Sequence, residues 1–373
     1  MASTLFSRAF LAASRRLITP SLLAETTLNL AAFLSKRSFY SQLGASSTWA
    51  RRAMASSGVG GKAGYSTSSV PTNMSLLSLL LSAMLNIYLV YVLVQVLDAS
   101  WYMPEEQRNL IQEYQVAHVP GALFFDLDGI SDRSTSLPHM LPSEEAFAAG
   151  CSALGIENKN GVVVYDAKGI YSAARVWWMF RAFGHNKVWV LDGGLPRWRA
   201  SGYDVESSAS GDAILKASAA SEAIEKIYQG QTVSPITFQT KFQQHLVWSL
   251  DQVKKNMEDQ TYQHIDARSK ARFDGTAPEP RKGIRSGHIP GSKCVPFPQL
   301  LDSSQTLLPA EEVKKRFEQE GSKLFPLHLK NEFHHMNQGL HRLGKTDVPV
   351  YDGSWNEWAT EPDLPMEGAE SSS

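Results

Sequence analysis

The stretch AHVPGA, residues 117–122, recurs in altered form as GHIPGS at residues 287–292. Two further landmarks keep the same order around each copy: LDA at 97–99, IDA at 265–267, LDGG at 191–194 and YDGS at 351–354. The offsets between the copies are 168, 170 and 160 residues. Three matched landmarks in one order indicate two similar domains, because the period is too long for a solenoid.

Within the first copy, short apolar segments alternate with a helical one. We expect strands at 162–165 and 187–191 and an aromatic-rich helix at 172–183. Apolar strands that alternate with helices predict a parallel sheet covered on both faces. The fold class is therefore α/β, with two tandem domains of this kind. Ligands bind beyond the carboxyl ends of such strands, so the loop after Tyr165 and its counterpart in the second copy are the candidate site loops.

Charge is distributed unevenly along the 373 residues. Residues 1–70 contain eight basic residues and one acidic residue, Glu25, although the whole chain has a net charge of −1. An acid-poor segment rich in Ser, Ala, Leu and Arg is typical of an organelle transit peptide. We expect import into the mitochondrial matrix rather than the chloroplast; the alternative is a disordered tail. The balanced total gives no indication of nucleic-acid binding.

The remaining chain divides into four segments: a first domain at 71–205, a linker at 206–245 rich in Ala, Ser and Gln, a second domain at 246–364 and a tail at 365–373. One stretch is unusual, because residues 74–97 contain no charged residue. A run of this length is a candidate membrane span. The favoured alternative is a helix followed by a buried strand, because the run enters the LDA landmark without a basic flank.

Long segments of the chain resemble a known family. AHVPGALFFDLD at 117–128, DARSKARFDGTAPEPRKGIRSGHIPGS at 266–292 and the paired DGG…W and DGS…W endings are similar to tandem rhodanese and 3-mercaptopyruvate sulfurtransferases, plant mitochondrial members above all. The resemblance implies transfer of sulfur from thiosulfate or 3-mercaptopyruvate, through a cysteine persulfide, to cyanide, a thiol or thioredoxin. It implies no cofactor. In this family only the second domain carries the cysteine, and the loop of the first domain is inert.

The resemblance also assigns roles to four side chains. Arg272 and Arg281 match the arginines that hold the mercaptopyruvate carboxylate by charge-assisted hydrogen bonds. Without the resemblance, surface salt bridging is the alternative. Asp128 and His139 match a pair that forms a triad with a serine of the cysteine loop, in which the histidine moves a proton and the aspartate orients it. By sequence alone, His139 is an ordinary loop residue.

The sequence departs from the family at the cysteine loop. Gly184 and Gly344 end equivalent helices, 160 residues apart, and this offset places the second loop near Pro326–Glu332. The segment contains no cysteine, glycine, serine or threonine. Backbone N–H groups that converge on an anion usually need glycine-permitted geometry. The nucleophile, its cradle and the triad serine are therefore absent, and we expect this chain to be inactive.

The two cysteines of the chain do not replace the missing nucleophile. Cys294 occupies the position of Phe124 in the first copy, and Cys151 lies on an expected helix among apolar residues. Both thiols are expected to be buried and inert. Two cysteines are also too few for a disulfide framework or a cysteine-based zinc site.

The departing segment 321–338 has structural consequences. We expect an incomplete second domain, because residues 323–325 offer only a short strand that Pro326 breaks. Four histidines with Glu332 form a possible metal site, although a solvated segment is favoured and we assign no metal: His328, His334, His335 and His341. The sharp bounds of 74–96 and 321–338 suggest alternative splicing or a faulty exon model, which transcripts read across the junctions would test.

Three functional hypotheses follow. The first is an active sulfurtransferase, which requires an unanticipated thiol. The second is a catalytically dead binding or regulatory protein that keeps Arg272 and Arg281. The third is a membrane-anchored protein that uses residues 74–97. The small-molecule donor is thiosulfate or 3-mercaptopyruvate, with thioredoxin or cyanide as acceptor, and membrane association is not favoured.

Overall fold

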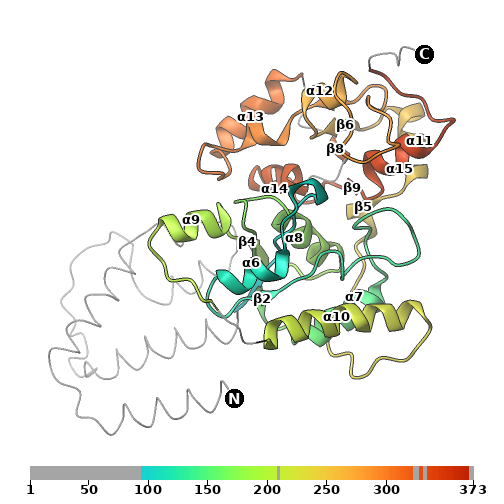
Figure 1. Ribbon diagram of the computed structural model, residues 1–373. Helices are drawn as coiled ribbons and strands as arrows, with labels where there is room; N and C mark the ends of the chain where they lie inside the picture. Colours follow the sequence, from blue (N-terminus) through green and yellow to red (C-terminus); the bar gives the residue numbers. More distant parts are fainter. Residues whose placement is uncertain (1–93, 208–210, 322–326, 331–333, 369–373) are drawn as a thin grey trace, which may run out of the picture. The chain divides into compact units, whose positions relative to one another are not determined.

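The structure, a computed structural model, describes residues 94–207, 211–321, 327–330 and 334–368 (Figure 1). Two parallel sheets succeed each other along this part of the chain. The first sheet has the order β2-β1-β3-β4 and the second the order β5-β9-β8-β6-β7. Every pair of named strands in the described part of the chain is parallel, which confirms the predicted α/β class.

The described elements of the first half follow the predicted alternation. Their bounds are β1 Val94–Asp98, the 3-10 helix η1 Pro104–Glu106, α6 Leu110–Val116, β2 Leu123–Phe124, α7 Glu144–Leu154, β3 Gly161–Tyr165, α8 Ala173–Ala182, β4 Val188–Val190, α9 Gly194–Ala200 and α10 Asp212–Tyr228. The two expected strands and the helix between them are confirmed as β3, β4 and α8.

The second half repeats this order. Its described elements are the 3-10 helix η2 Gln244–Leu246, β5 Val247–Trp248, α11 Leu250–Asp259, β6 Gln263–Asp266, α12 Lys270–Phe273, β7 Lys293–Cys294, the 3-10 helix η3 Phe297–Leu300, α13 Ala310–Gln319, β8 Leu327–Lys330, α14 His334–Arg342, β9 Val350–Tyr351 and α15 Ser354–Thr360. Equivalent positions keep equivalent registers, because Asp98 pairs with Tyr165 and Asp266 pairs with Lys330. The sequence landmarks are thus the ends of matching strands.

The central strand of the second sheet corrects one prediction. β8 lies between β9 and β6, so the central strand of the described sheet is at residues 327–330 rather than at the predicted 323–325. Pro326 does not break this strand, because β8 begins directly after it, and proline is tolerated where a strand starts. The predicted strand at 323–325 lies outside the described residues.

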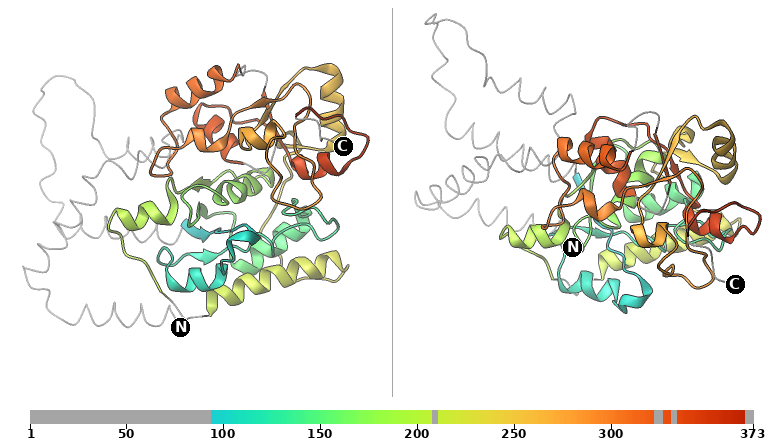
Figure 2. Two further views of the ribbon diagram at one scale, coloured as in Figure 1. Left: turned by 45° about the horizontal axis from the view of Figure 1, so that its top comes forward. Right: turned by 90° about the horizontal axis from the view of Figure 1, so that it is seen from above.

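The segment predicted as a linker, 206–245, contains α10, which packs along α7 (Figures 1 and 2). Ala217, Ala220, Ala223 and Ile224 are buried on one side of this helix. Their spacing of three or four residues places them on a single helical face. The small side chains allow a close approach, so a composition typical of a linker here forms a packed helix.

Residues 94–97 of the uncharged run belong to strand β1, which pairs with β2 and β3. The rest of the run, 74–93, lies outside the described residues. Among the described helices, none has the length and apolar character that crossing a membrane requires. For its last residues, the buried-strand alternative is therefore correct.

Helices α8 and α14 bring the two sheet-bearing halves into contact. Trp177 of α8 meets His341 of α14 edge to face, with 5.3 Å between the ring centroids. One cluster of buried apolar residues runs from the first sheet into the second. Polar groups near this contact are therefore shielded from water by both halves.

Candidate active site

The predicted Asp128–His139 pair is formed. His139 Nδ1 lies 3.1 Å from Asp128 Oδ1, and the indole N–H of Trp101 donates to Asp128 Oδ2 at 3.0 Å. The Trp101 ring also meets the His139 ring edge to face, with 4.7 Å between centroids. The indole therefore positions both members of the pair, a role that sequence reasoning missed because it assigned nothing to Trp101.

The pKa of Asp128 reflects these contacts. Partial burial acts to raise it, but the hydrogen bond and charge of His139, together with the bond from Trp101, outweigh burial and hold the pKa below the ordinary value of 3.8. Because the folded pKa is depressed, the stability gained from the pair is complete above pH 3.8. It is lost as the pH falls through the lower folded value.

Replacement of His139 tests this assignment. We expect His139→Gln to raise the pKa of Asp128, because the desolvation remains while the largest favourable partner is lost. Carboxyl carbon NMR during an acid titration would measure the shift. Asp302, whose carboxylate is held by Ser304 and Thr306, is the matched control and should keep its pKa. An unchanged Asp128 titration would contradict the pairing.

Arg175 fixes the backbone of His139. Its Nη2 donates to the carbonyl of His139, which has a left-handed φ of 58°, and its Nη1 donates to Asp352 Oδ1 at 2.7 Å. Asp352 Oδ2 accepts from the N–H of Leu141 at 2.8 Å. The Asp352 carboxylate at the end of β9 thus holds the histidine loop of the first half against the second sheet.

Arg272 is not an isolated cation. Its Nε donates to Glu279 Oε2 at 2.9 Å, and its Nη2 contacts the same oxygen. Glu279 Oε1 accepts from Arg268 Nη1 at 2.5 Å, and Arg268 Nη2 donates to Asp266 Oδ2 at 2.6 Å. The two arginines and the two carboxylates together have no net charge. A positive charge that attracts a substrate carboxylate to this region must therefore come from another residue.

Arg281 is half-buried in the segment between α12 and β7. The Arg272–Glu279 pair belongs to the second half and the Asp128–His139 pair to the first half. The roles of the four predicted side chains in substrate binding stay predictions. Glu279 lies within the segment 266–292, two residues before Arg281, and its charge was the signal that could have revealed its pairing with Arg272.

The loop after β3 is the one that the family resemblance implies to be inert. Asp166, which is 1% exposed, accepts backbone hydrogen bonds from Lys168 at 2.8 Å, Tyr171 at 2.6 Å and Ala173 at 3.0 Å. Burial raises the pKa of Asp166, and these N–H donors act in the opposite direction. The N–H groups are therefore already occupied by a carboxylate of the chain itself.

The corresponding connection in the second half is much shorter. Seven residues separate β3 from α8, whereas three residues, 331–333, separate β8 from α14. The loop predicted near Pro326–Glu332 is misplaced, because residues 327–330 form β8. Residues 331–333 are Asn, Glu and Phe and lie outside the described residues. Neither the predicted segment nor this connection contains a cysteine.

Both cysteines lie in the described part of the chain, and both are buried. Cys151 on α7 is 0% exposed and Cys294 at the end of β7 is 5% exposed. Burial raises the pKa of Cys151 well above its ordinary value. Burial, and then the charge of Asp266, raise the pKa of Cys294 to about 12. Both thiols therefore stay protonated at neutral pH, and a protonated thiol is a poor nucleophile.

Thiol accessibility gives a direct prediction. In the folded protein we expect neither cysteine to react rapidly with dithiobis(nitrobenzoate), whereas two thiols should react at once in denaturant. The release of the coloured thiolate at pH 8 measures both phases. Cys294→Ala should leave the slow native rate unchanged. A fast native phase that this variant abolishes would show an accessible thiol.

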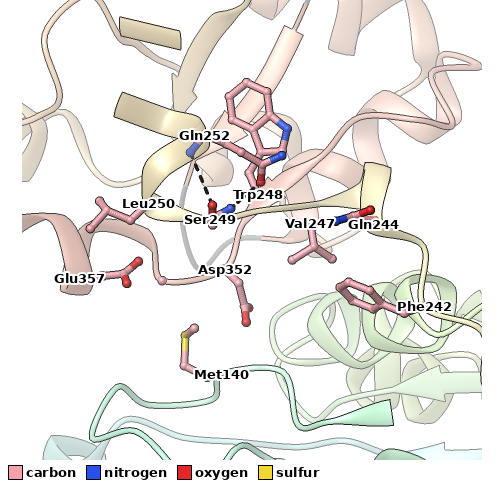
Figure 3. A pocket seen from close by; sticks show the side chains of 11 residues that line it. Met140, Phe242, Gln244, Val247, Trp248, Ser249, Leu250, Gln252, Asp352 and Glu357 are labelled. Carbon is pink, nitrogen blue, oxygen red and sulfur yellow. Dashed lines mark hydrogen bonds between the residues drawn. The ribbon is translucent and has the colours of Figure 1, made fainter. Parts of the chain in front are cut away.

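A cavity of about 430 Å³ opens beside Asp352 at the carboxyl ends of β5 and β9 (Figure 3). Met140, the neighbour of His139, lines it from the first half. From the second half, Trp248, Leu250, Asp352 and Glu357 contribute to its wall. The cavity is at the sheet edge where ligands bind in this class of fold, but neither Arg272 nor Arg281 lines it.

The histidine cluster has only one described side chain, that of His341. Among residues 94–207, 211–321, 327–330 and 334–368, no group of three or more potential ligands could hold a metal ion. Glu332 lies outside these ranges. The structure therefore gives no support to the metal alternative within the part that it describes.

The fold and the paired motif ends define a protein of two rhodanese-like domains. The profile of the rhodanese-like domain matches residues 93–201 and 249–361. Over its full length the chain is 74% identical to the whole mitochondrial thiosulfate/3-mercaptopyruvate sulfurtransferase 1 of Arabidopsis thaliana. It is 38% identical over 71% of its length to 84% of the human 3-mercaptopyruvate sulfurtransferase.

Solved structures agree with this assignment. The chain matches the Tum1 protein of Saccharomyces cerevisiae at 28% identity with a TM-score of 0.63, covering 76% of this chain and 96% of that one. It matches the 3-mercaptopyruvate sulfurtransferase SseA of Escherichia coli at 30% identity with a TM-score of 0.60, covering 74% and 97%. The chain belongs to the thiosulfate/3-mercaptopyruvate sulfurtransferase family. The mitochondrial relative and the basic N-terminus also agree on a mitochondrial protein.

Proposed function

We propose that this chain is a sulfurtransferase-family protein of the mitochondrial matrix that does not carry sulfur on a cysteine. The supporting observation is the burial of both thiols, at 0% and 5% exposure. In addition, only three residues separate β8 from α14, where the family resemblance implies a cysteine loop. A persulfide forms on a thiolate that a donor can reach. Neither condition is met by Cys151 or Cys294.

The protein keeps the means to bind a small-molecule donor. The names of the relatives identify thiosulfate and 3-mercaptopyruvate as donors of those proteins. Arg281, Arg272 and the Asp128–His139 pair are the groups that would hold the carboxylate and the thiol of 3-mercaptopyruvate. Glu279 binds two donors of Arg272, so a bound carboxylate would share this arginine with Glu279. The protein is thus a binding or regulatory member of its family.

A sulfur-transfer assay tests the proposal. Protein lacking residues 1–70, shown to be folded by its tryptophan fluorescence, receives thiosulfate or 3-mercaptopyruvate with cyanide as acceptor, and thiocyanate is measured. We expect no turnover above the blank with either donor. Turnover that disappears in Cys294→Ala would identify a working thiol and overturn the proposal.

Binding is measured separately by calorimetry with 3-mercaptopyruvate. We expect saturable binding that Arg281→Gln weakens by about tenfold, because one charge-assisted hydrogen bond is lost. The exposed Arg316 of α13 provides the control variant Arg316→Gln, which should bind as the unaltered protein does. Absence of binding in the unaltered protein would remove the binding role.

A further inference from the structure

Three arginines are buried in the part of the chain that the structure describes, and one of them forms no ion pair there. The Arg175 side chain is paired with Asp352, and that of Arg268 with Asp266 and Glu279. Arg181, at the end of α8, is 7% exposed, and no described carboxylate lies within ion-pairing distance of it. A buried cation without a counter-ion is costly.

One donor of Arg181 is also unsatisfied. Its Nη2 donates to the carbonyl of Thr346 at 2.7 Å, whereas Nη1 is buried and has no hydrogen-bond partner among the described residues. Its guanidinium carbon lies 4.9 Å from the ring centroid of Trp177, which holds the group in place. Burial lowers the pKa of Arg181, and the charge of Asp347 opposes this shift only in part. The geometry therefore presents a fixed charged donor that still needs an acceptor.

Arg181 lines a polar cavity of about 340 Å³. Asn186 of the first half, Gln243 and His245 of the connecting segment, and His341 of the second half line the same cavity. Amide, imidazole and guanidinium groups can all donate to an anion. The volume suits a small anion rather than a nucleotide or a peptide.

The cavity contains one acidic group, Asp347. Its side chain is 75% exposed and its carboxylate lies 3.9 Å from the ring of His245. An exposed carboxylate is screened by water, whereas the buried Arg181 is not. The buried end of the cavity is therefore cationic even though its rim carries a negative charge.

We propose that this cavity, between Arg181 and His341, binds a small tetrahedral oxyanion of the sulfate or thiosulfate type. The anion would accept from Arg181 Nη1 and from the imidazole and amide donors around it, and would supply the missing counter-charge. The site is separate from Arg272, Arg281 and the Asp128–His139 pair, so the inference does not depend on the proposed function.

Protonation of His341 should make anion binding at this site depend on pH. Burial, and then the charge of Arg181, lower the pKa of His341 to about 4, whereas Asp347 acts to raise it. The groups that face this ring are Arg181, Asp347, His245 and the Trp177 ring. A bound dianion would raise the pKa of His341, so anion affinity should increase as the pH falls from 8 to 5.

Calorimetric titration of sulfate into the full-length protein at constant ionic strength tests the proposal. Sulfate is a dianion throughout this pH range, so any change of affinity with pH reports on the protein. We expect saturable binding that Arg181→Gln weakens at least about tenfold. Arg316→Gln, at an exposed position of α13, is the matched control and should leave the affinity unchanged.

Competition experiments and a second variant test the proposal further. Thiosulfate and phosphate should compete with sulfate, and formate should not compete at equal concentration. Should Arg181→Gln fail to fold, His341→Gln should keep binding at pH 8 and lose the gain at pH 5. No saturable sulfate binding, equal weakening by Arg316→Gln, or equal competition by formate would overturn the proposal.

Discussion

Arg268→Met is expected to lower the free energy of unfolding by about 3–5 kcal/mol, since it removes one partner from a buried ion-pair network. The Arg268 side chain is 2% exposed, and its partners Asp266 and Glu279 are 0% and 2% exposed. Arg268 also donates to the carbonyl of Gly287 at 2.6 Å and lies over the ring of Trp355. Without the guanidinium, both carboxylates lose their most buried cation.

Urea unfolding followed by tryptophan fluorescence measures this loss, and Trp355 reports on the site itself. Arg316→Met, at an exposed position, should change the stability by less than about 0.5 kcal/mol. The double variant with Glu279→Gln should lose less than the sum of the two single variants, because the second substitution removes a charge that the first left unpaired. A loss under about 1 kcal/mol for Arg268→Met would contradict the network.

The sequence predicted the parts of the fold that depend on local pattern. The landmarks LDA and IDA are the ends of β1 and β6, and β3, α8 and β4 occupy the expected ranges. The two sheets have the same parallel strand pairing, so a motif that occurs in both copies lies at the same position in each sheet. The Asp128–His139 pair was also predictable, although only through the family resemblance, because the ten loop residues between them do not by themselves bring the two side chains together.

Other features could not be predicted, because the same sequence pattern is compatible with more than one structure. Pro326 predicts the end of a strand, but it directly precedes β8, and a proline gives the same sequence signal at the start of a strand as at its end. The Ala- and Ser-rich composition of 206–245 predicts a linker and does not reveal α10, because small residues make the apolar face that packs on α7 hard to recognise. The Arg175–Asp352 contact spans 177 residues, and no local pattern predicts the partner of a charge across that separation.

Arg175→Gln is expected to cost about 3 kcal/mol or more and to loosen the contact between the halves. The Arg175 and Asp352 side chains are 8% and 7% exposed, so truncation leaves a buried carboxylate with only the N–H of Leu141. The protein contains its own control, because Arg342 pairs with Asp192 across the same contact at 2.9 Å. That arginine is 33% exposed, so Arg342→Gln should cost at most about 1 kcal/mol.

The Arg175–Asp352 and Arg342–Asp192 pairs have similar surroundings, so the difference between them is the burial of the arginine. Asp192 accepts from the N–H of Leu307 just as Asp352 accepts from that of Leu141. Two residues before each leucine stands a residue in the left-handed region, Gln305 with φ 59° and His139 with φ 58°. Duplication therefore produced two junctions of one design, and only the more buried one carries a histidine.

The site responds to the two substitutions differently. Arg175 binds the carbonyl of His139, so Arg175→Gln should also free the histidine loop and raise the pKa of Asp128 in the carboxyl NMR titration. Arg342→Gln should leave that pKa unchanged, because Arg342 binds Leu307, Leu308 and Asp192. If Arg175→Gln and Arg342→Gln lower the free energy of unfolding in urea equally, burial does not explain a difference between the two ion pairs. A changed pKa of Asp128 in both variants would show that the whole contact, rather than Arg175, positions His139.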